Sequence, residues 1–303
     1  MTPAVPRTSS QVAPLAALIG GACAIAFAPI FVRLADTGPA AAGFWRLTLA
    51  LPMLAVIALA SRKGDKSLPL SPGWPALIAG LFFAGDLACW HYGIALTTVS
   101  NATVLANLTP IVVTLAAWIA FRETPLRLFV FGLALGLLGA WTMAEARGAS
   151  APGRNPHLGD LLSAITALWY AAYFIAVRRA RSLRMASVVM FWSSLAGAPV
   201  LLLISALLHE PLAPASAGGW WACLGLAVVH VTGQGAIAWA LGRLPAATAS
   251  VVVLVQPVVA ATLGFLLFQE ALSPLQALGA VVCLGGVALA QWAAAKPQPS
   301  TAQ

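Results

Sequence analysis

Two stretches of sequence decide the fold: FWRLTLALP at residues 44–52 and FWSSLAGAP at residues 191–199. Both begin with a Phe-Trp pair and end in a proline, and they lie 147 residues apart. The same shift brings further uncommon residues into register without a gap: Trp74 with Trp221, Pro110 with Pro257, Phe121 with Phe268, Glu123 with Glu270, Gly132 with Gly279 and Gly139 with Gly286. Chance can match Ala and Leu in an apolar chain, but not Trp, Pro and a lone Glu in one register. The chain therefore contains an internal duplication.

The composition indicates an integral membrane protein. Hydrophobic residues make up 61% of the 303 and charged residues 8%, with a mean hydropathy of +0.92. Soluble domains carry about a quarter of their residues as charges, so this chain has too few to cover a surface in water. The net charge is +8, but no basic stripe with interleaved aromatics is present, so no nucleic-acid partner is expected.

The apolar runs are broken by Gly, Pro or charge and predict ten membrane-spanning helices, each about 20 residues or longer. The predicted spans are 12–35, 38–61, 73–97, 100–121, 124–146, 157–181, 185–208, 215–242, 246–268 and 273–295. The first run is too long for the core of a signal peptide, so it is interpreted as a retained span. The short alternating segments of a membrane β-barrel are absent from the sequence.

The loop charges predict the orientation. With the N-terminus inside, 12 Lys and Arg fall in the inner segments and 3 in the outer loops (Arg33, Arg147 and Arg154). Cytoplasmic segments carry the excess of positive charge, so both tails, 1–11 and 296–303, are predicted to be cytoplasmic.

The duplication and the span count together predict an inverted repeat. Each half, 12–146 and 157–295, holds five spans, so the loop of Glu123 faces inward and that of Glu270 faces outward. The predicted fold class is therefore an all-α membrane protein of two inverted five-helix repeats, related by a pseudo-two-fold axis in the membrane plane. This architecture is typical of secondary transporters, whose substrate sites lie near the midplane between the repeats.

The two proline spans and the junctions that follow them resemble a known family. Duplicated Pro110 and Pro257, with Phe121-Arg122-Glu123 and Phe268-Gln269-Glu270, resemble the drug/metabolite transporter superfamily, in its ten-helix branch of two EamA-like repeats. The resemblance implies export of small metabolites across a bacterial inner membrane, and within the superfamily the chain is most similar to aromatic amino-acid exporters. Small multidrug members use a Glu in their first span for proton coupling, and residues 12–35 hold no such Glu. Proton antiport and facilitated diffusion therefore both stay open.

Ionisable groups inside spans are costly in a bilayer and mark candidate site residues. Asp86 and Trp90 share a face of the third span, with His91 on the next face. These residues are predicted either to contact a substrate amino group or a proton, or, for Asp86, to pair with Arg46 and only hold helices together. On the eighth span the pair His230 and Gln234 forms either a cavity wall or interhelical hydrogen bonds.

The proline spans supply further candidates. Asn101 and Asn107 precede Pro110, and Gln256 precedes Pro257. A proline frees a carbonyl one turn back, and such a break is tolerated in a membrane beside protein or a water-filled cavity. We therefore predict the three polar residues to line the transport path and Pro110, Pro257 and Pro29 to act as hinges. The alternative is that the prolines only kink helices for packing.

Aromatic and glycine patterns complete the candidate set. Trp169 and Tyr173 share a face of the sixth span, where they form either an aromatic wall for a planar or cationic group or a packing contact. Glycines of the fifth and tenth spans predict close helix approach, either within the chain or in a homodimer.

Other functional classes are disfavoured. The four cysteines stand singly without nearby His ligands, so neither a metal site nor a cofactor is predicted. No catalytic motif appears, so the chain is predicted not to be an enzyme. A membrane-embedded enzyme would need a metal or nucleophile constellation and a channel a selectivity ring, and the sequence shows neither.

Overall fold

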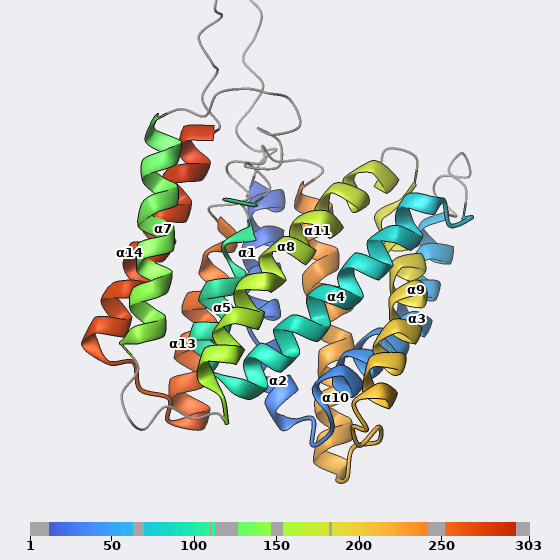
Figure 1. Cartoon of the computed structure of the whole chain (residues 1–303). Coiled ribbons are helices and arrows are strands. Elements are labelled where there is room, and N and C mark those ends of the chain that lie inside the picture. The colour runs from blue at the N-terminus through green and yellow to red at the C-terminus, as the bar shows by residue number, and fades with distance from the viewer. Residues whose placement is uncertain are drawn as a thin grey trace, which may run out of the picture.

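A computed structural model describes residues 12–62, 70–109, 111–112, 127–146, 154–181, 184–241 and 252–294. Within these ranges all regular secondary structure is helical (Figure 1). The helices are α1 (Val12–Ile25), α2 (Ala28–Leu34), α3 (Pro39–Arg62), α4 (Trp74–Leu96), α5 (Val99–Ala106), α7 (Arg127–Glu145), α8 (Pro156–Arg181), α9 (Ala186–Leu207), α10 (Ala217–Val229), a π-helical turn η2 (His230–Gln234), α11 (Gly235–Leu241), α13 (Val255–Phe268) and α14 (Pro274–Ala294).

The helices confirm the all-α membrane fold. Six segments are long and apolar enough to cross a membrane: Val12–Leu34, Pro39–Ser61, Trp74–Leu96, Pro156–Arg181, Ala186–Leu207 and Ala217–Ile237. Shorter apolar helices cover Arg127–Met143, Val255–Phe268 and Pro274–Ala290. These nine segments fall on nine predicted spans. The fourth predicted span begins with α5, and most of its second half lies outside the described residues, as do both predicted tails.

The duplicated Phe-Trp pairs show how the two repeats face each other. Trp45 Nε1 donates to the carbonyl of Leu212, 2.8 Å away, and Trp192 Nε1 donates to that of Leu70, 2.7 Å away. Each tryptophan stands near the start of its own helix and bonds to the segment that follows the other helix. Helices α3 and α9, which pack together, are therefore antiparallel. Inverted repeats require this arrangement.

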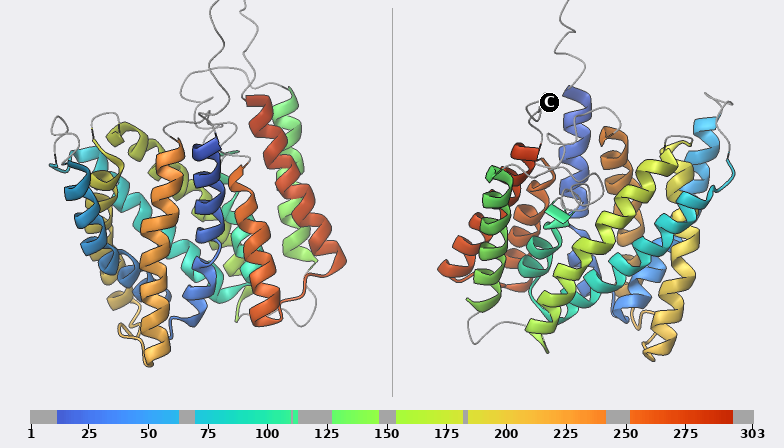
Figure 2. Two further views of the ribbon diagram at one scale, coloured as in Figure 1. Left: turned by 180° about the vertical axis from the view of Figure 1, so that it is seen from behind. Right: turned by 45° about the horizontal axis from the view of Figure 1, so that its top comes forward.

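Helices α7 and α14 pair along a seam of glycines at one edge of the molecule (Figures 1 and 2). A Cβ on Gly132 would come within 2.8 Å of the Gly286 carbonyl, and one on Gly139 within 2.6 Å of the Gly279 carbonyl. Each glycine thus meets the repeat-equivalent of the other, as a two-fold axis between the helices demands. The glycines buttress the two repeats within the chain. A homodimer contact through these helices stays a prediction, and it would use other faces than this seam.

The first span is broken near its middle. Helix α1 ends at Ile25, a turn covers residues 26–27, and Pro29 stands in the first turn of α2. Proline suits the first turn of a helix because no earlier carbonyl needs its missing N–H. Pro29 therefore stands at a break in the first span, and its role as a hinge stays a prediction.

The fourth and ninth spans are interrupted at equivalent positions. Helix α5 ends at Ala106 and residues 107–108 form a turn, three residues ahead of Pro110. Residues 252–253 are helical, and Leu254 forms a turn three residues ahead of the buried Pro257. Helix α13 begins directly after this turn, at Val255. Pro110 itself lies outside the described residues. The turn at Leu254 matches the one at Asn107 in the 147-residue register, so the interruption belongs to the repeat.

Candidate functional site

The rings of Phe83, on α4, and His230, in the π-helical turn, stack at the centre of the molecule. Their centroids are 5.4 Å apart and their planes differ by 25°. The two residues are equivalent under the 147-residue shift. Residues related by a two-fold axis touch only where the axis passes, so the pseudo-two-fold axis runs between these rings. Inverted-repeat transporters bind their substrates at this kind of location.

Around this pair lies a set of buried or half-buried polar and aromatic side chains, here called the central cluster. It comes from helices α3, α4, α8 and α9 and from the π-helical turn, and it consists of Arg46, Phe83, Asp86, Trp90, Tyr170, Tyr173, Ser194, His230 and Gln234. Both repeats contribute to it.

Helix α8 supplies an aromatic wall to the central cluster. Tyr173 is 5% exposed and stacks on Phe83 with centroids 4.6 Å apart. Tyr170 stacks on Tyr173 at 5.7 Å. The Tyr170 hydroxyl accepts a hydrogen bond from Gln234 Nε2 at 3.2 Å, which links the wall to the π-helical turn. These rings offer a flat surface to a planar group.

Helix α4 supplies the charged face. Phe83, Asp86 and Trp90 follow one another at helical spacing and so share one side of α4. From α3, the guanidinium carbon of Arg46 lies 5.9 Å from the ring centres of both Phe83 and Trp90. Arg46 is 2% exposed and Asp86 5%. Within the described ranges these two residues form no direct ion pair, although their charges act on each other.

The eighth span is not a uniform α-helix. Residues His230–Gln234 form a π-helical turn between α10 and α11, whereas the equivalent third span is one continuous helix, α4. π-Helical turns inside α-helices often occur at functional sites. His230 and Gln234 are both buried, and His230 Nε2 lies 3.1 Å from the Ser194 hydroxyl. Helical periodicity in the sequence places His230 and Gln234 on one face of the eighth span, but it does not predict the π-helical turn.

Three other predicted residues are not members of the central cluster, although the ring centroid of His91 lies 6.0 Å from that of Trp90. His91 is fully buried, and its Nδ1 lies 3.0 Å from the Pro39 carbonyl at the start of α3. Trp169 is 38% exposed and packs over Gly85, whereas Tyr173 on the same helix is buried. Gln256 is half-buried at the start of α13. The structure therefore separates Trp169 from the tyrosine with which the sequence groups it.

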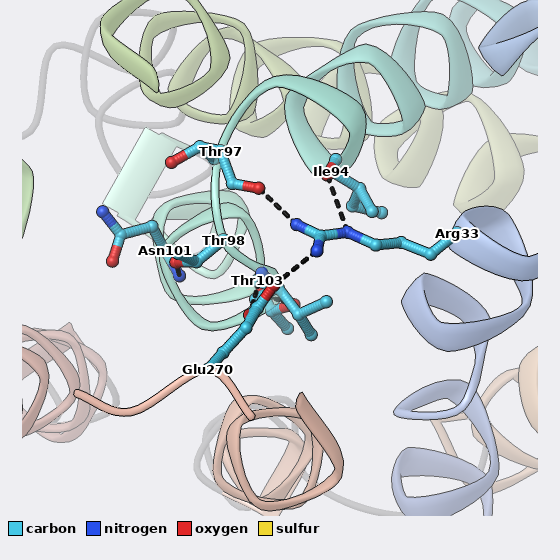
Figure 3. A network of polar contacts seen from close by, with 8 residues as sticks. Arg33, Ile94, Thr97, Thr98, Asn101, Thr103 and Glu270 are labelled. Carbon is cyan, nitrogen blue, oxygen red and sulfur yellow. Dashed lines mark hydrogen bonds and ion pairs between the residues drawn. The ribbon is translucent and has the colours of Figure 1, made fainter. Parts of the chain in front are cut away.

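A second polar arrangement, here called the outer network, ties the repeats together at the predicted outer end (Figure 3). Arg33 of α2 forms an ion pair with Glu270, which follows α13, at 2.5 Å. Arg33 also donates to the carbonyls of Ile94 (3.2 Å) and Thr97 (2.5 Å), and Glu270 accepts from the Val99 amide at 2.8 Å. Burial raises the pKa of the Glu270 carboxyl above its ordinary value, and the charge of Arg33 opposes that rise.

Of the two predicted asparagines, Asn101 lies in the first turn of α5, next to the outer network, and Asn107 is the residue directly after the end of α5. Asn101 is fully buried, and its Nδ2 donates to Asp160 at 3.3 Å while its Oδ1 accepts from Gln276 at 3.5 Å. Asn107 Nδ2 donates to the Thr103 carbonyl of its own helix at 2.8 Å. Asn101 thus links α5 to α8 and α14, and Asn107 caps the end of α5; neither side chain is part of the central cluster.

Several residues of these two sites are not recognisable as a set in the sequence. Arg46 lies well inside its predicted span, 38–61, and its cost in a bilayer is the signal that marks it. Phe83 and Tyr170 have no such signal, because buried aromatics are common in apolar helices. The pairing of Arg33 with Glu270 joins the first span to the ninth, and no local pattern predicts it.

An inverted repeat with a buried polar and aromatic cluster on its axis defines a membrane transporter of small molecules. Comparison with family models agrees: the EamA-like transporter family matches twice, at residues 13–144 and 157–292. The chain belongs to this family, which confirms the resemblance to drug/metabolite transporters.

Solved structures support the fold. One solved crystal structure is 22% identical in sequence to this chain and superposes on it with a TM-score of 0.63. The match covers 94% of this chain and 97% of the other chain. At this identity the match shows a shared fold. No curated protein matches the sequence.

Proposed function

We propose that this transporter exports small amphipathic metabolites, in particular aromatic or other neutral amino acids, by alternating access across a bacterial inner membrane. The observation that carries the proposal is the central cluster on the pseudo-two-fold axis. Phe83 and Tyr173 offer stacked aromatic surface to a planar side chain. Asp86, buried beside them, offers a carboxylate to an amino group.

The outer network supports alternating access in the orientation predicted from the loop charges. Arg33 belongs to the first repeat and Glu270 to the second, so their ion pair holds the repeats together at the outer end. A second link acts beside it: Glu210 accepts from the amides of Ala40 (3.2 Å) and Ala41 (2.9 Å) and from the hydroxyl of Tyr92. Opening the site outward would require both links to break.

The driving force divides the proposal into two cases. Asp86 is the acid of the central cluster, and a proton on Asp86 would compete with a substrate ammonium, which is the basis of antiport. If Asp86 binds only substrate, transport follows the substrate gradient. The Asp86→Asn variant separates the cases, because it retains shape and removes both charge and proton.

The test is flux in proteoliposomes that contain the full chain, with a panel of amino acids and with or without a pH gradient. We expect flux of Phe, Tyr and Trp. A rate that rises with the gradient and loses this response in Asp86→Asn supports antiport, whereas a rate indifferent to the gradient removes Asp86 and His91 as coupling groups. Absence of flux for every amino acid, with flux of other metabolites or drugs, would contradict the substrate class.

Alanine variants of Tyr173 and Trp169 test the aromatic wall, with Tyr173→Phe as the control. Tyr173→Ala should lower Phe and Trp transport about two- to tenfold, since a stacked aromatic pair contributes about 0.5–1.5 kcal/mol. Trp169 stays a predicted wall residue, but its 38% exposure leads us to expect a smaller loss for Trp169→Ala. Tyr173→Phe keeps the ring and serves as the control. Equal loss of transport and of folded protein in Tyr173→Ala would indicate packing alone.

A further inference from the structure

Arg46 presents donors that the protein does not satisfy. It lies in the first half of α3 and is 2% exposed. Its Nε and Nη1 atoms have no hydrogen-bond partner among the described residues. Buried polar groups almost always have partners, and a buried charge without one is strongly unfavourable. An Arg within a membrane span is costly, so the presence of this one points to a function in binding.

The aromatic neighbours of Arg46 do not replace a hydrogen-bond acceptor. The guanidinium carbon lies 5.9 Å from each of the rings of Phe83 and Trp90. A cation near ring faces is attracted by their π-electrons, but that attraction leaves the N–H groups unpaired. A planar anion with two oxygens is the partner that a guanidinium binds best.

The surroundings of Arg46 suit a ligand that carries both charges. Asp86 stands between Phe83 and Trp90 on the same face of α4. Trp90 Nε1 and His230 Nδ1 are further buried atoms without hydrogen-bond partners in the part of the chain that the structure describes. A carboxylate at Arg46 and an ammonium at Asp86 would leave a ring side chain against Phe83.

The cation occurs in one repeat only. The 147-residue shift relates Arg46 to Ser193, whose hydroxyl donates to the Met190 carbonyl of its own helix at 3.1 Å. The same shift relates Asp86 to Gly233. The charges therefore break the two-fold symmetry of the site, so a bound solute has one preferred orientation along the path.

We propose that Arg46 binds the carboxylate of the transported solute, so that the substrates of this transporter are small carboxylates with α-amino acids as the main class. The inference rests on the proposed function, which it sharpens by naming the group that is recognised.

The test compares acids with their matched amides on the purified full chain, by ligand-induced thermal shift and by competition for flux. The pairs are phenylalanine with phenylalaninamide, tryptophan with tryptophanamide, and phenyllactate with its amide. We expect the wild type to bind each acid about tenfold or more tightly than its amide, as charge-assisted hydrogen bonds contribute. Arg46→Gln should abolish the difference and Arg46→Lys should retain part of it. Ser193→Ala, at the equivalent position, should leave it unchanged.

The outcomes separate this inference from the proposed function. Equal binding of acids and amides by the wild-type protein overturns the role of Arg46, and this result does not depend on whether the variants fold. Failure of every carboxylate to bind the wild-type protein overturns it as well. If phenyllactate binds in an Arg46-dependent way and no amino acid does, the carboxylate site stands and the amino-acid substrate is wrong. The melting temperature of ligand-free Arg46→Gln shows whether the loss reflects folding.

Discussion

Phe83 and His230 occupy equivalent positions in the two repeats and stack on each other, with ring centroids 5.4 Å apart. One ring is apolar, while the other carries two nitrogens, of which Nε2 lies 3.1 Å from the Ser194 hydroxyl. The duplication thus preserves the shape of the contact and has changed its chemistry. The same divergence separates Arg46 from Ser193 and leaves the charges of the central cluster in the first repeat.

His230→Phe tests which part of this contact matters. The stack with Phe83 should persist. The variant should lose about 1–3 kcal/mol of stability, because the buried Ser194 hydroxyl no longer has a hydrogen-bond partner in the ring. Transport should fall about tenfold if His230 contacts the solute. Phe83→Ala, which removes a ring that is 1% exposed, should instead destabilise by about 3–5 kcal/mol. Thermal unfolding in detergent and flux measure the two effects, and unchanged flux in His230→Phe would assign the histidine to packing.

Arg33→Gln should destabilise the protein by about 2–3 kcal/mol, because it leaves the buried carboxylate of Glu270 without its cation. The cost is lower than for a fully buried pair, since the Arg33 side chain is 17% exposed and that of Glu270 2%. The double variant Arg33→Gln with Glu270→Gln should recover most of the loss, because no unpaired charge remains. Thermal unfolding of Arg33→Gln, of Glu270→Gln and of the double variant gives the coupling energy between the two residues. Simple addition of the two single effects would mean that the ion pair has no net role.

The outer network should also respond to pH, through Glu270. With the Arg33–Glu270 ion pair formed, which is the closed arrangement, burial raises the pKa of Glu270. The carboxyl therefore binds a proton more tightly in the closed arrangement than it would when exposed to water. Low pH on the side of the outer network therefore favours closure, and closure weakens as the pH rises through the raised pKa of Glu270.

A cysteine beside the network measures this effect. Val32 is 8% exposed and lines, with Arg33, a hollow of about 340 Å³ at the end that is predicted to face outward. In a chain without native cysteines, Val32→Cys should react faster with a membrane-impermeant maleimide as pH rises. The thiol itself becomes more reactive at high pH, so Glu270→Gln is the reference. An identical pH profile with and without Glu270 would show that this carboxyl does not control closure.

The glycine seam predicts a position-specific loss of stability. Gly139→Ala places a Cβ within 2.6 Å of the Gly279 carbonyl and should force α7 and α14 apart, at a cost of about 1–3 kcal/mol. Gly285→Ala on α14 meets nothing within 4 Å and should be neutral or slightly stabilising. Melting temperatures of the two variants in detergent measure the difference. Equal values would show that the helices can separate without cost.

The sequence alone determined the spans, the duplication and the inversion. Hydropathy locates each span because the bilayer thickness sets its length. The 147-residue register and the odd number of spans in each half then imply the antiparallel packing that Trp45 and Trp192 display. These are properties of the order of residues along one chain, and they need no knowledge of which helices touch.

Tertiary structure decided which polar residues meet. Asp86 lies with Arg46 in the central cluster, whereas Asn101 lies with Asp160 beside the outer network, although sequence reasoning assigned both predicted residues to one path. Tyr173 is buried and Trp169 is 38% exposed on the same predicted face. The physical reason is that these outcomes depend on how helices distant in the sequence cross. Helical periodicity gives the direction of a side chain about its own axis, not the neighbour that it meets.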